Sequence, residues 1–140
     1  MPEEQRLKYS QLEAGYEFLP SSYKLDASTV STYLKAVEDT SYPYQDTNLV
    51  PPMAIAAYAM AALSQNIYLP SGTIHVSQEL RFIDTVCLNE SLVSYAKVSQ
   101  KRGRGKFRLL AVDLNVFNQN QKLVLTGETS FILPEQDDGR

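Results

Sequence analysis

Residues 49–63 read Leu-Val-Pro-Pro-Met-Ala-Ile-Ala-Ala-Tyr-Ala-Met-Ala-Ala-Leu. They lie within a longer stretch, residues 47–78, that contains no Asp, Glu, Lys or Arg, although these four types make up 21% of the chain. Pro52 fits the first position of a helix, where the missing N–H of proline leaves no helical hydrogen bond unmade. We therefore predict a helix from Pro52 to about Asn66, buried along most of its circumference by a surrounding sheet.

Strands dominate the second half of the chain. Alternation along residues 73–83 places His75 on the same strand face as Ser77 and Glu79. Further segments rich in Val, Leu, Phe and Tyr predict strands over residues 91–100, 106–118 and 122–133. Between these strands, Gly103-Arg104-Gly105 and residues 118–121 have the composition of turns.

The first half of the chain holds a smaller helix and an irregular strand. Asp26 is a good N-cap for a helix that ends near Glu38, and Pro20 limits residues 15–25 to an edge or broken strand.

Taken together, these elements predict an α+β protein in which helices precede a meander of antiparallel strands. The length of 140 residues fits one domain over residues 1–140, with loose ends at about residues 1–12 and 135–140.

Charge and cysteine content exclude several classes of protein. The net charge of −3 and the pI near 5.1 argue against nucleic acid or an anionic membrane as a partner. Ser64-Gln65-Asn66 interrupts the apolar stretch well before the roughly 20 residues that a membrane span needs. Cys87 is the single cysteine and forms neither an internal disulfide nor a metal cluster, and the acidic start of the chain does not resemble a signal peptide. These features favour a cytoplasmic protein without a metal.

Two segments carry a resemblance to a known family. Residues 69–82 read Leu-Pro-Ser-Gly-Thr-Ile-His-Val-Ser-Gln-Glu-Leu-Arg-Phe, and residues 116–128 read Val-Phe-Asn-Gln-Asn-Gln-Lys-Leu-Val-Leu-Thr-Gly-Glu. Together with Val86 and Glu90-Ser91-Leu92, they resemble the MaoC-like hotdog proteins, which are (R)-specific enoyl-CoA hydratases and 3-hydroxyacyl-thioester dehydratases. The resemblance covers residues 26–134. It implies a single hotdog domain, with the sheet wrapped around the helix from Pro52, and a dimer with an acyl-thioester tunnel between its subunits.

Hydration of an enoyl thioester needs a base for the water, an acid for C2 and hydrogen-bond donors for the enolate-like oxygen. The family usually supplies them with Asp and His in a Gly-Asp-x-Asn-Pro-x-His segment and with a backbone N–H in a His-Gly-Met segment. By the same resemblance, Asp39 stands at the position of the catalytic Asp and Tyr44 at that of the His. Pro52 stands at that of the Gly, where it offers no N–H, so that Met53 is the remaining oxyanion donor.

These departures weaken the expected chemistry. Removal of one oxyanion donor lowers rates by about 10²–10³, and a general acid or base contributes about 10²–10⁴. Tyrosine, whose side chain ordinarily has a pKa of about 10, is a poorer base near neutral pH than histidine. The pattern of Asp39 with Tyr44 and Pro52 is similar to the non-catalytic N-terminal half of double-hotdog dehydratases.

Other residues have a functional and a structural interpretation. Ala57 and its small neighbours on the long helix would permit a tunnel, or else pack in the core. His75, the only histidine, is a candidate for substrate binding or an ordinary strand residue. A basic hairpin would clamp the phosphates of coenzyme A or an acidic carrier-protein helix, or else form a solvated turn; its candidate residues are Lys101, Arg102, Arg104 and Lys106.

We therefore predict a protein that binds acyl-CoA or acyl-carrier-protein thioesters and has a degenerate catalytic site. Alternatives are an active hydratase or dehydratase that uses Asp39 with Tyr44, a hotdog thioesterase, and a structural subunit of a heteromeric dehydratase. The thioesterase ranks low because Pro52 to Asn66 contains no carboxylate. No cofactor is implied. A homodimer is the family default, and a catalytic hotdog partner is the alternative.

Overall fold

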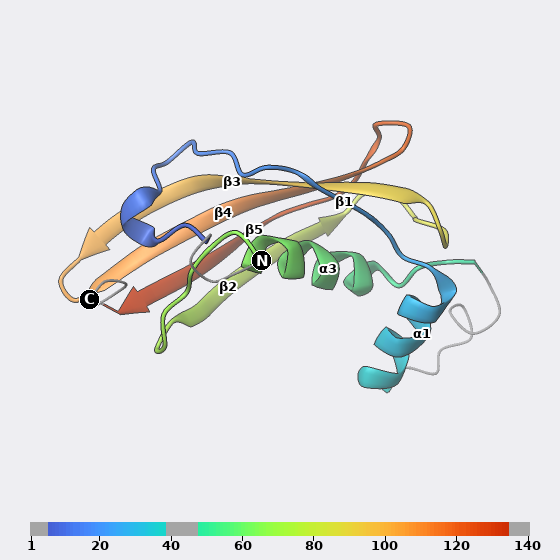
Figure 1. The fold of residues 1–140 in the computed structure, drawn as a ribbon, viewed down its shortest axis with the longest axis horizontal. Helices are drawn as coiled ribbons and strands as arrows, with labels where there is room; N and C mark the ends of the chain where they lie inside the picture. The colour runs from blue at the N-terminus through green and yellow to red at the C-terminus, as the bar shows by residue number, and fades with distance from the viewer. Residues whose placement is uncertain (1–5, 39–47, 135–140) are drawn as a thin grey trace.

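The computed structural model describes residues 6–38 and 48–134. Long antiparallel strands curve around one helix, and a second, shorter helix lies beyond the end of that helix (Figure 1). In chain order the elements are the 3₁₀ helix η2 (Tyr9–Gln11), β1 (Ser21–Lys24), α1 (Ala27–Ala36), α3 (Pro52–Ser64), β2 (Ile74–Phe82), β3 (Ser91–Arg104), β4 (Phe107–Asn118) and β5 (Leu123–Pro134). This arrangement confirms the predicted α+β class.

The five strands form one sheet in the order β1-β3-β4-β5-β2, with every neighbouring pair antiparallel. Strands β3, β4 and β5 form the meander that the sequence predicts. The prediction was wrong for β2, which pairs with β5 instead of with β3, its neighbour in the sequence. β1 is short and lies at an edge of the sheet, in agreement with the effect expected of Pro20.

Helix α1 begins where the sequence predicts. The Oδ1 atom of Asp26 accepts a hydrogen bond of 2.8 Å from the backbone N–H of Thr29, which lowers the pKa of the Asp26 carboxyl. The helix ends at Ala36, and Val30 and Leu34 are its buried residues.

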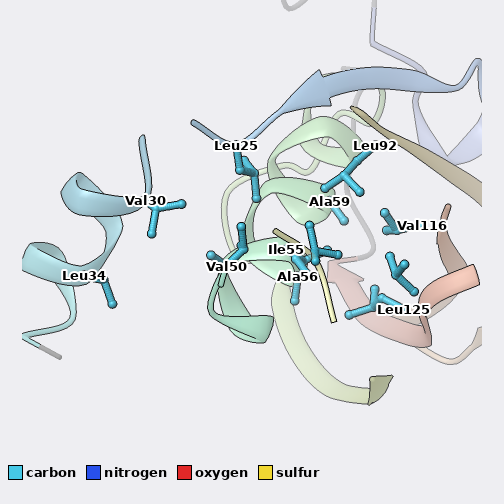
Figure 2. Packing of buried hydrophobic residues seen from close by; sticks show 13 residues of the cluster. Leu25, Val30, Leu34, Val50, Ile55, Ala56, Ala59, Leu92, Val116 and Leu125 are labelled. Carbon is cyan, nitrogen blue, oxygen red and sulfur yellow. The ribbon is translucent and has the colours of Figure 1, made fainter. Parts of the chain in front are cut away.

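Helix α3 packs one face against the sheet. Its buried residues Ala54, Ile55, Ala56 and Ala59 join a cluster that includes residues of β3, β4 and β5, as Figure 2 shows. The expectation of burial around most of the helix was wrong for a single chain. Met53 is 50% exposed, and other residues of the same face are also exposed: Ala57 and Ala61.

A second apolar cluster fills the other end of the sheet. Of the expected loose end at residues 1–12, the structure describes residues 6–12, and Tyr9 and Leu12 among them are buried. Tyr9, Leu12 and Phe18 contribute to this cluster together with Leu63 and Phe131. An isolated bridge between Leu7 and Ile67 also joins the N-terminal segment to the chain just after α3.

A β-bulge changes the face of the sheet on which His75 lies. The register between β2 and β5 shifts between His75 and Ser77. His75 pairs with Phe131 on the face that packs on α3, whereas Ser77 and Glu79 pair with residues of the opposite face. The prediction that these three residues share a face was wrong, because one extra residue in a bulge inverts the alternation of side chains.

Of the two predicted hairpin turns, one lies where the sequence places it and the other is shifted. At residues 118–121, the side chain of Asn118 accepts hydrogen bonds from the backbone N–H groups of Asn120 and Lys122, which confirms the turn. The other turn is shifted along the chain, because Gly103 still pairs with Arg108 within the ladder and the turn lies at Gly105, whose φ is +59°.

Gly127 in β5 permits a close approach of β2. A Cβ atom at this position would lie 2.3 Å from the backbone oxygen of Glu79 and 2.9 Å from the Cδ2 atom of Leu80. We predict that Gly127→Ala lowers the free energy of unfolding by about 1–3 kcal/mol, because the backbone of β2 must move to make room. Urea unfolding measures the change.

Gly103→Ala is the matched control, because a Cβ atom there meets no atom within 4 Å. Its expected effect is within about 0.5 kcal/mol. Equal stability of Gly127→Ala and the native chain would contradict the close approach.

Candidate functional site

The two predicted catalytic residues, Asp39 and Tyr44, lie outside the described residues. The described part of the candidate site therefore begins at the N-terminus of α3. Pro51 is the N-cap residue, with φ −59° and ψ 131°, and Pro52 is the first residue of the helix. The sequence predicted this start correctly.

The first turn of α3 has an unusual set of backbone donors. Pro52 has no N–H, and the N–H of Ala54 donates a hydrogen bond of 2.9 Å to the oxygen of Pro51. The N–H of Met53 lies between them, and such N–H groups at a helix start have no partner within the helix. Among the backbone groups of this turn, Met53 therefore has the N–H best suited to bind a developing oxyanion.

The exposed face of α3 continues from this turn as an apolar surface. Met53 and Ala57 are exposed one turn apart, and Ala61 follows after another turn. No charged residue occurs along α3. This face can lie against an alkyl chain without the desolvation of a charge.

His75 is held by two contacts on the face of the sheet that packs on α3. Its Nε2 atom lies 2.6 Å from the Oγ1 atom of Thr129, which is fully buried, and its ring stacks on that of Phe131 at 5.0 Å between centroids. The imidazole itself is exposed. Sequence reasoning missed Thr129, because the bulge that brings His75 to it is invisible in the alternation of residues.

Within one chain, His75 and the start of α3 are not brought together. Phe131, which stacks on His75, packs in the cluster that contains Leu63 near the C-terminal end of α3. Pro52 and Met53 form the other end of the same helix.

The basic hairpin serves in part to hold the N-terminal segment. The Nζ atom of Lys101 donates a hydrogen bond of 2.7 Å to the backbone oxygen of Leu12 and lies 4.7 Å from the centroid of the Tyr9 ring. The guanidinium of Arg108 also lies 4.7 Å from this centroid. Burial raises the pKa of the Tyr9 phenol, and the charge of Arg108 opposes this effect.

The remaining predicted clamp residues lie at or beside the turn. Arg102 is exposed in β3, Arg104 is the last residue of β3, and Lys106 is exposed in the turn. The turn and the N-terminus of α3 lie toward opposite ends of the molecule (Figure 1). Within one chain, a phosphate clamp at this hairpin would therefore lie far from the start of α3.

We predict that Lys101→Met lowers the free energy of unfolding by about 1–3 kcal/mol, because the Leu12 oxygen loses a charge-assisted hydrogen bond and the Tyr9 ring loses a cation. Thermal or urea unfolding measures the loss. Lys106→Met is the matched control, since Lys106 is exposed, and its expected change is within about 0.5 kcal/mol. A similar loss in both variants would contradict a structural role specific to Lys101.

Charged residues form a row across the outer face of the sheet, which faces away from α3. In register across four strands, the row contains Lys97, Asp113, Glu128 and Glu79. The Oγ atom of Ser99 donates a hydrogen bond of 2.8 Å to Glu128. Partial burial and the charge of Glu128 raise the pKa of the Asp113 carboxyl, and the charge of Lys97 opposes them.

We predict that Asp113→Asn stabilises the protein at pH 7 and has less effect at low pH. A carboxyl whose pKa is higher in the folded state binds more protons folded than unfolded, so stability falls as the pH rises from the ordinary carboxyl pKa through the folded value. Melting temperatures between pH 3 and pH 8 measure the difference.

Glu17→Gln is the control, because the backbone of Glu17 is bridged to that of Lys97 instead of to that of an acidic residue. Glu17→Gln is expected not to raise the melting temperature at pH 7. If the melting temperatures of the native chain and of Asp113→Asn change in parallel with pH, the charges of this row do not repel one another.

The outer face also has an aromatic groove that the sequence did not indicate. Tyr95 and Phe117 lie edge to face at 5.5 Å between ring centroids. The groove has a volume of about 760 Å³, and its other lining residues include Glu17, Lys97, Asn115 and Gln119. It lies on the opposite side of the sheet from α3 and from His75, and so it is separate from the candidate acyl site.

Two further features bear on the class of protein. Within residues 6–38 and 48–134, no three or more His, Cys, Asp or Glu residues lie close enough together to hold a metal ion. None of the helices in the same ranges has both the length and the hydropathy for a membrane crossing.

Comparison with known proteins identifies the architecture. Residues 13–127 match the family model described as the FAS1-like dehydratase domain region. The comparison with curated proteins gave no significant match.

Solved structures of similar fold come from several bacteria. R-hydratase PhaJ1 from Pseudomonas aeruginosa has 22% sequence identity and a TM-score of 0.78, over 94% of this chain and 91% of its own. The MaoC-like dehydratase from Rhodospirillum rubrum has 15% identity and a TM-score of 0.76, over 92% and 97%. The C-terminally truncated 3R-hydroxyacyl-ACP dehydratase complex HadBC from Mycobacterium tuberculosis has 15% identity and a TM-score of 0.65, over 85% and 96%. These similarities confirm the hotdog fold.

Proposed function

We propose that this chain, which belongs to the FAS1-like dehydratase region family and has the hotdog fold of the MaoC-like proteins, binds acyl thioesters at a site with little catalytic activity of its own. The observation that carries the proposal is Pro52 at the first position of α3, where the resemblance to MaoC-like proteins implies a backbone donor that proline lacks. The family match spans this position and the segment of Asp39 and Tyr44.

The surface of α3 supports a ligand with an alkyl chain. Met53 and Ala57 present an exposed, uncharged face that begins at the helix N-terminus. A thioester carbonyl would lie at that terminus, where the helix dipole favours negative charge, and the acyl chain would follow the apolar face. Acyl-CoA and acyl-carrier-protein thioesters share this chemistry.

A specific observation favours an active hydratase or dehydratase as the second candidate. The N–H of Met53 remains as a backbone donor beside Pro52, and it would replace the donor that Pro52 lacks. In this mechanism Asp39 performs the acid and base steps, and Tyr44 orients the water. A thioesterase has less support, because α3 contains no carboxylate.

We also propose that the chain acts as a dimer. β2 is the outermost strand beside β5 in the described sheet, and Ile74, Val76 and Phe82 on it are each at least 41% exposed. Unpaired apolar edges of this kind are suited to pairing with another chain. HadBC is a complex of hotdog chains, and a heteromeric arrangement with a catalytic partner is the alternative to a homodimer here.

We predict that acyl-CoA raises the melting temperature of the purified protein in a saturable manner, whereas trans-2-enoyl-CoA is not hydrated at a measurable rate. A ligand at 100 times its Kd contributes about 2.7 kcal/mol to stability. Thermal unfolding measures binding, and absorbance of the conjugated thioester measures turnover. Asp39→Asn should leave the thermal shift unchanged.

Ala57→Asp should abolish the shift, because it places a charge on the apolar face of α3. Gln65→Glu, which adds the same charge beyond the end of the helix, is the matched control. Turnover that disappears in Asp39→Asn would establish the active enzyme instead. Absence of both binding and turnover would contradict an acyl-thioester site.

A further inference from the structure

The groove on the outer face of the sheet has an aromatic floor. The rings of Tyr95 in β3 and Phe117 in β4 are nearly perpendicular, with 87° between their planes and 5.5 Å between their centroids. In such a contact Phe117 leaves at least one face of the Tyr95 ring uncovered. Tyr95 is accordingly 45% exposed, although β3 has a neighbouring strand on each side. The groove volume of about 760 Å³ lies within the range of roughly 300–1,000 Å³ that small-molecule sites occupy.

Carboxamide side chains surround these rings. Each can both donate and accept a hydrogen bond, as a hydroxyl group can. The Oδ1 atom of Asn115 accepts a hydrogen bond of 2.7 Å from Thr126, so the Nδ2 group on the other side of the carboxamide is left as a donor for a ligand. The Nε2 atom of Gln119 lies 3.3 Å from its acceptor Glu90, which leaves the Gln119 oxygen as an acceptor. The carboxamide residues that line the groove are Asn115, Asn118, Gln119 and Gln121.

The charges around the groove disfavour an anionic ligand. Within the described residues, Glu17 and Lys97 are the charged side chains of the lining. Across the sheet from Lys97, the next residues in register are Asp113 and Glu128. One cation is therefore outnumbered by three carboxylates, and a phosphate or carboxylate group would meet a negative potential. An uncharged ligand meets no such opposition.

We propose that this groove is a second ligand site, which takes an uncharged sugar. A pyranose has an apolar face of C–H groups and a rim of hydroxyl groups. The apolar face lies on the exposed ring of Tyr95, and the hydroxyl groups exchange hydrogen bonds with Asn115 and Gln119. A sugar has hydroxyl groups on several sides of its ring, which matches carboxamides placed around an aromatic floor. The site is on the opposite side of the sheet from α3, so the proposal does not depend on the acyl-thioester function.

Titration of the full chain with sugars, followed in ¹H–¹⁵N NMR spectra, tests the site. The probes are methyl β-D-glucopyranoside, methyl β-D-galactopyranoside and methyl α-D-mannopyranoside. At least one should shift the side-chain amide signals of Asn115 and Gln119 and the backbone signal of Tyr95 in a saturable manner. The signals of Met53 and Ala57 on α3 should stay in place. The absence of saturable shifts with all three sugars would overturn the proposal, and so would shifts centred on α3.

Two further ligands test the chemistry of the site. Adenosine, which is uncharged and can also stack on an aromatic ring, should bind at least tenfold more weakly than the sugar that binds best. Tighter binding of adenosine would assign the groove to a nucleobase and overturn the sugar. The uronate of the best sugar should also bind more weakly, because its carboxylate meets the negative potential around Glu17 and Asp113. Equal affinity of the uronate would overturn the restriction to uncharged sugars.

Variants of the lining separate the contributions of the ring and of the carboxamide. Tyr95→Ala should weaken binding of the best sugar at least tenfold, whereas Tyr95→Phe, which keeps the ring, should retain most of the affinity. Asn115→Asp keeps the acceptor for Thr126 but lacks the Nδ2 donor, and it should weaken binding about tenfold. Because Asn115→Asp preserves the shape of the side chain, it tests the site even if the loss of the Tyr95 ring disturbs the fold.

Phe107→Ala is the matched control, because Phe107 is an aromatic residue of the same strand β4, 58% exposed and outside the groove. It should bind the sugar with native affinity. Native affinity in both Tyr95→Ala and Asn115→Asp would overturn the proposal, and so would an equal loss of affinity in Phe107→Ala.

Discussion

The close packing of α3 on the sheet is the constraint on which the rest of the structure depends. Ala54, Ala56 and Ala59 are at most 1% exposed, and their methyl groups are the only side-chain atoms between the helix backbone and its neighbours at these positions. Small residues let a helix approach a sheet closely, and a tightly packed interior does not tolerate added volume without displacement of its neighbours. Two further alanines of the same helix, Ala57 and Ala61, lie on its exposed face. One composition thus provides both the core contact and the uncharged surface of the candidate site.

Much of the fold could be predicted because its strongest signals are local. Pro52 marks the start of α3, Asp26 caps α1, and Asn118 makes the hairpin turn with its own side chain. Each of these effects depends on residues within a few positions along the chain. The pairing of β2 with β5 depends instead on contacts between residues about fifty positions apart, and no local pattern specifies such a partner.

The candidate site was less predictable, and His75 shows why. Alternation of polar and apolar residues assigned it to the face of Ser77, but one bulged residue moves it to the opposite face, where it meets Thr129 and Phe131. The hairpin residue Lys101 was assigned to a possible anion clamp on charge alone, yet its ammonium group is held by the Leu12 oxygen and the Tyr9 ring. Charge and alternation are properties of the sequence, whereas the partner of each side chain is a property of the fold. The start of α3, where Pro52 removes a donor, could be read directly because the missing N–H is a covalent property.

The sheet order has a consequence for synthesis of the protein on the ribosome. β2 leaves the ribosome directly after α3, but its partner β5 is made later than any other strand of the described residues. Until then, the apolar edge and face of β2 have no sheet to join, while α3 has only part of its core. Long-range strand pairing of this kind is slow to form, and unpaired apolar strands are prone to aggregation. An apolar strand without its partner therefore persists in the nascent chain during the interval between the synthesis of β2 and that of β5.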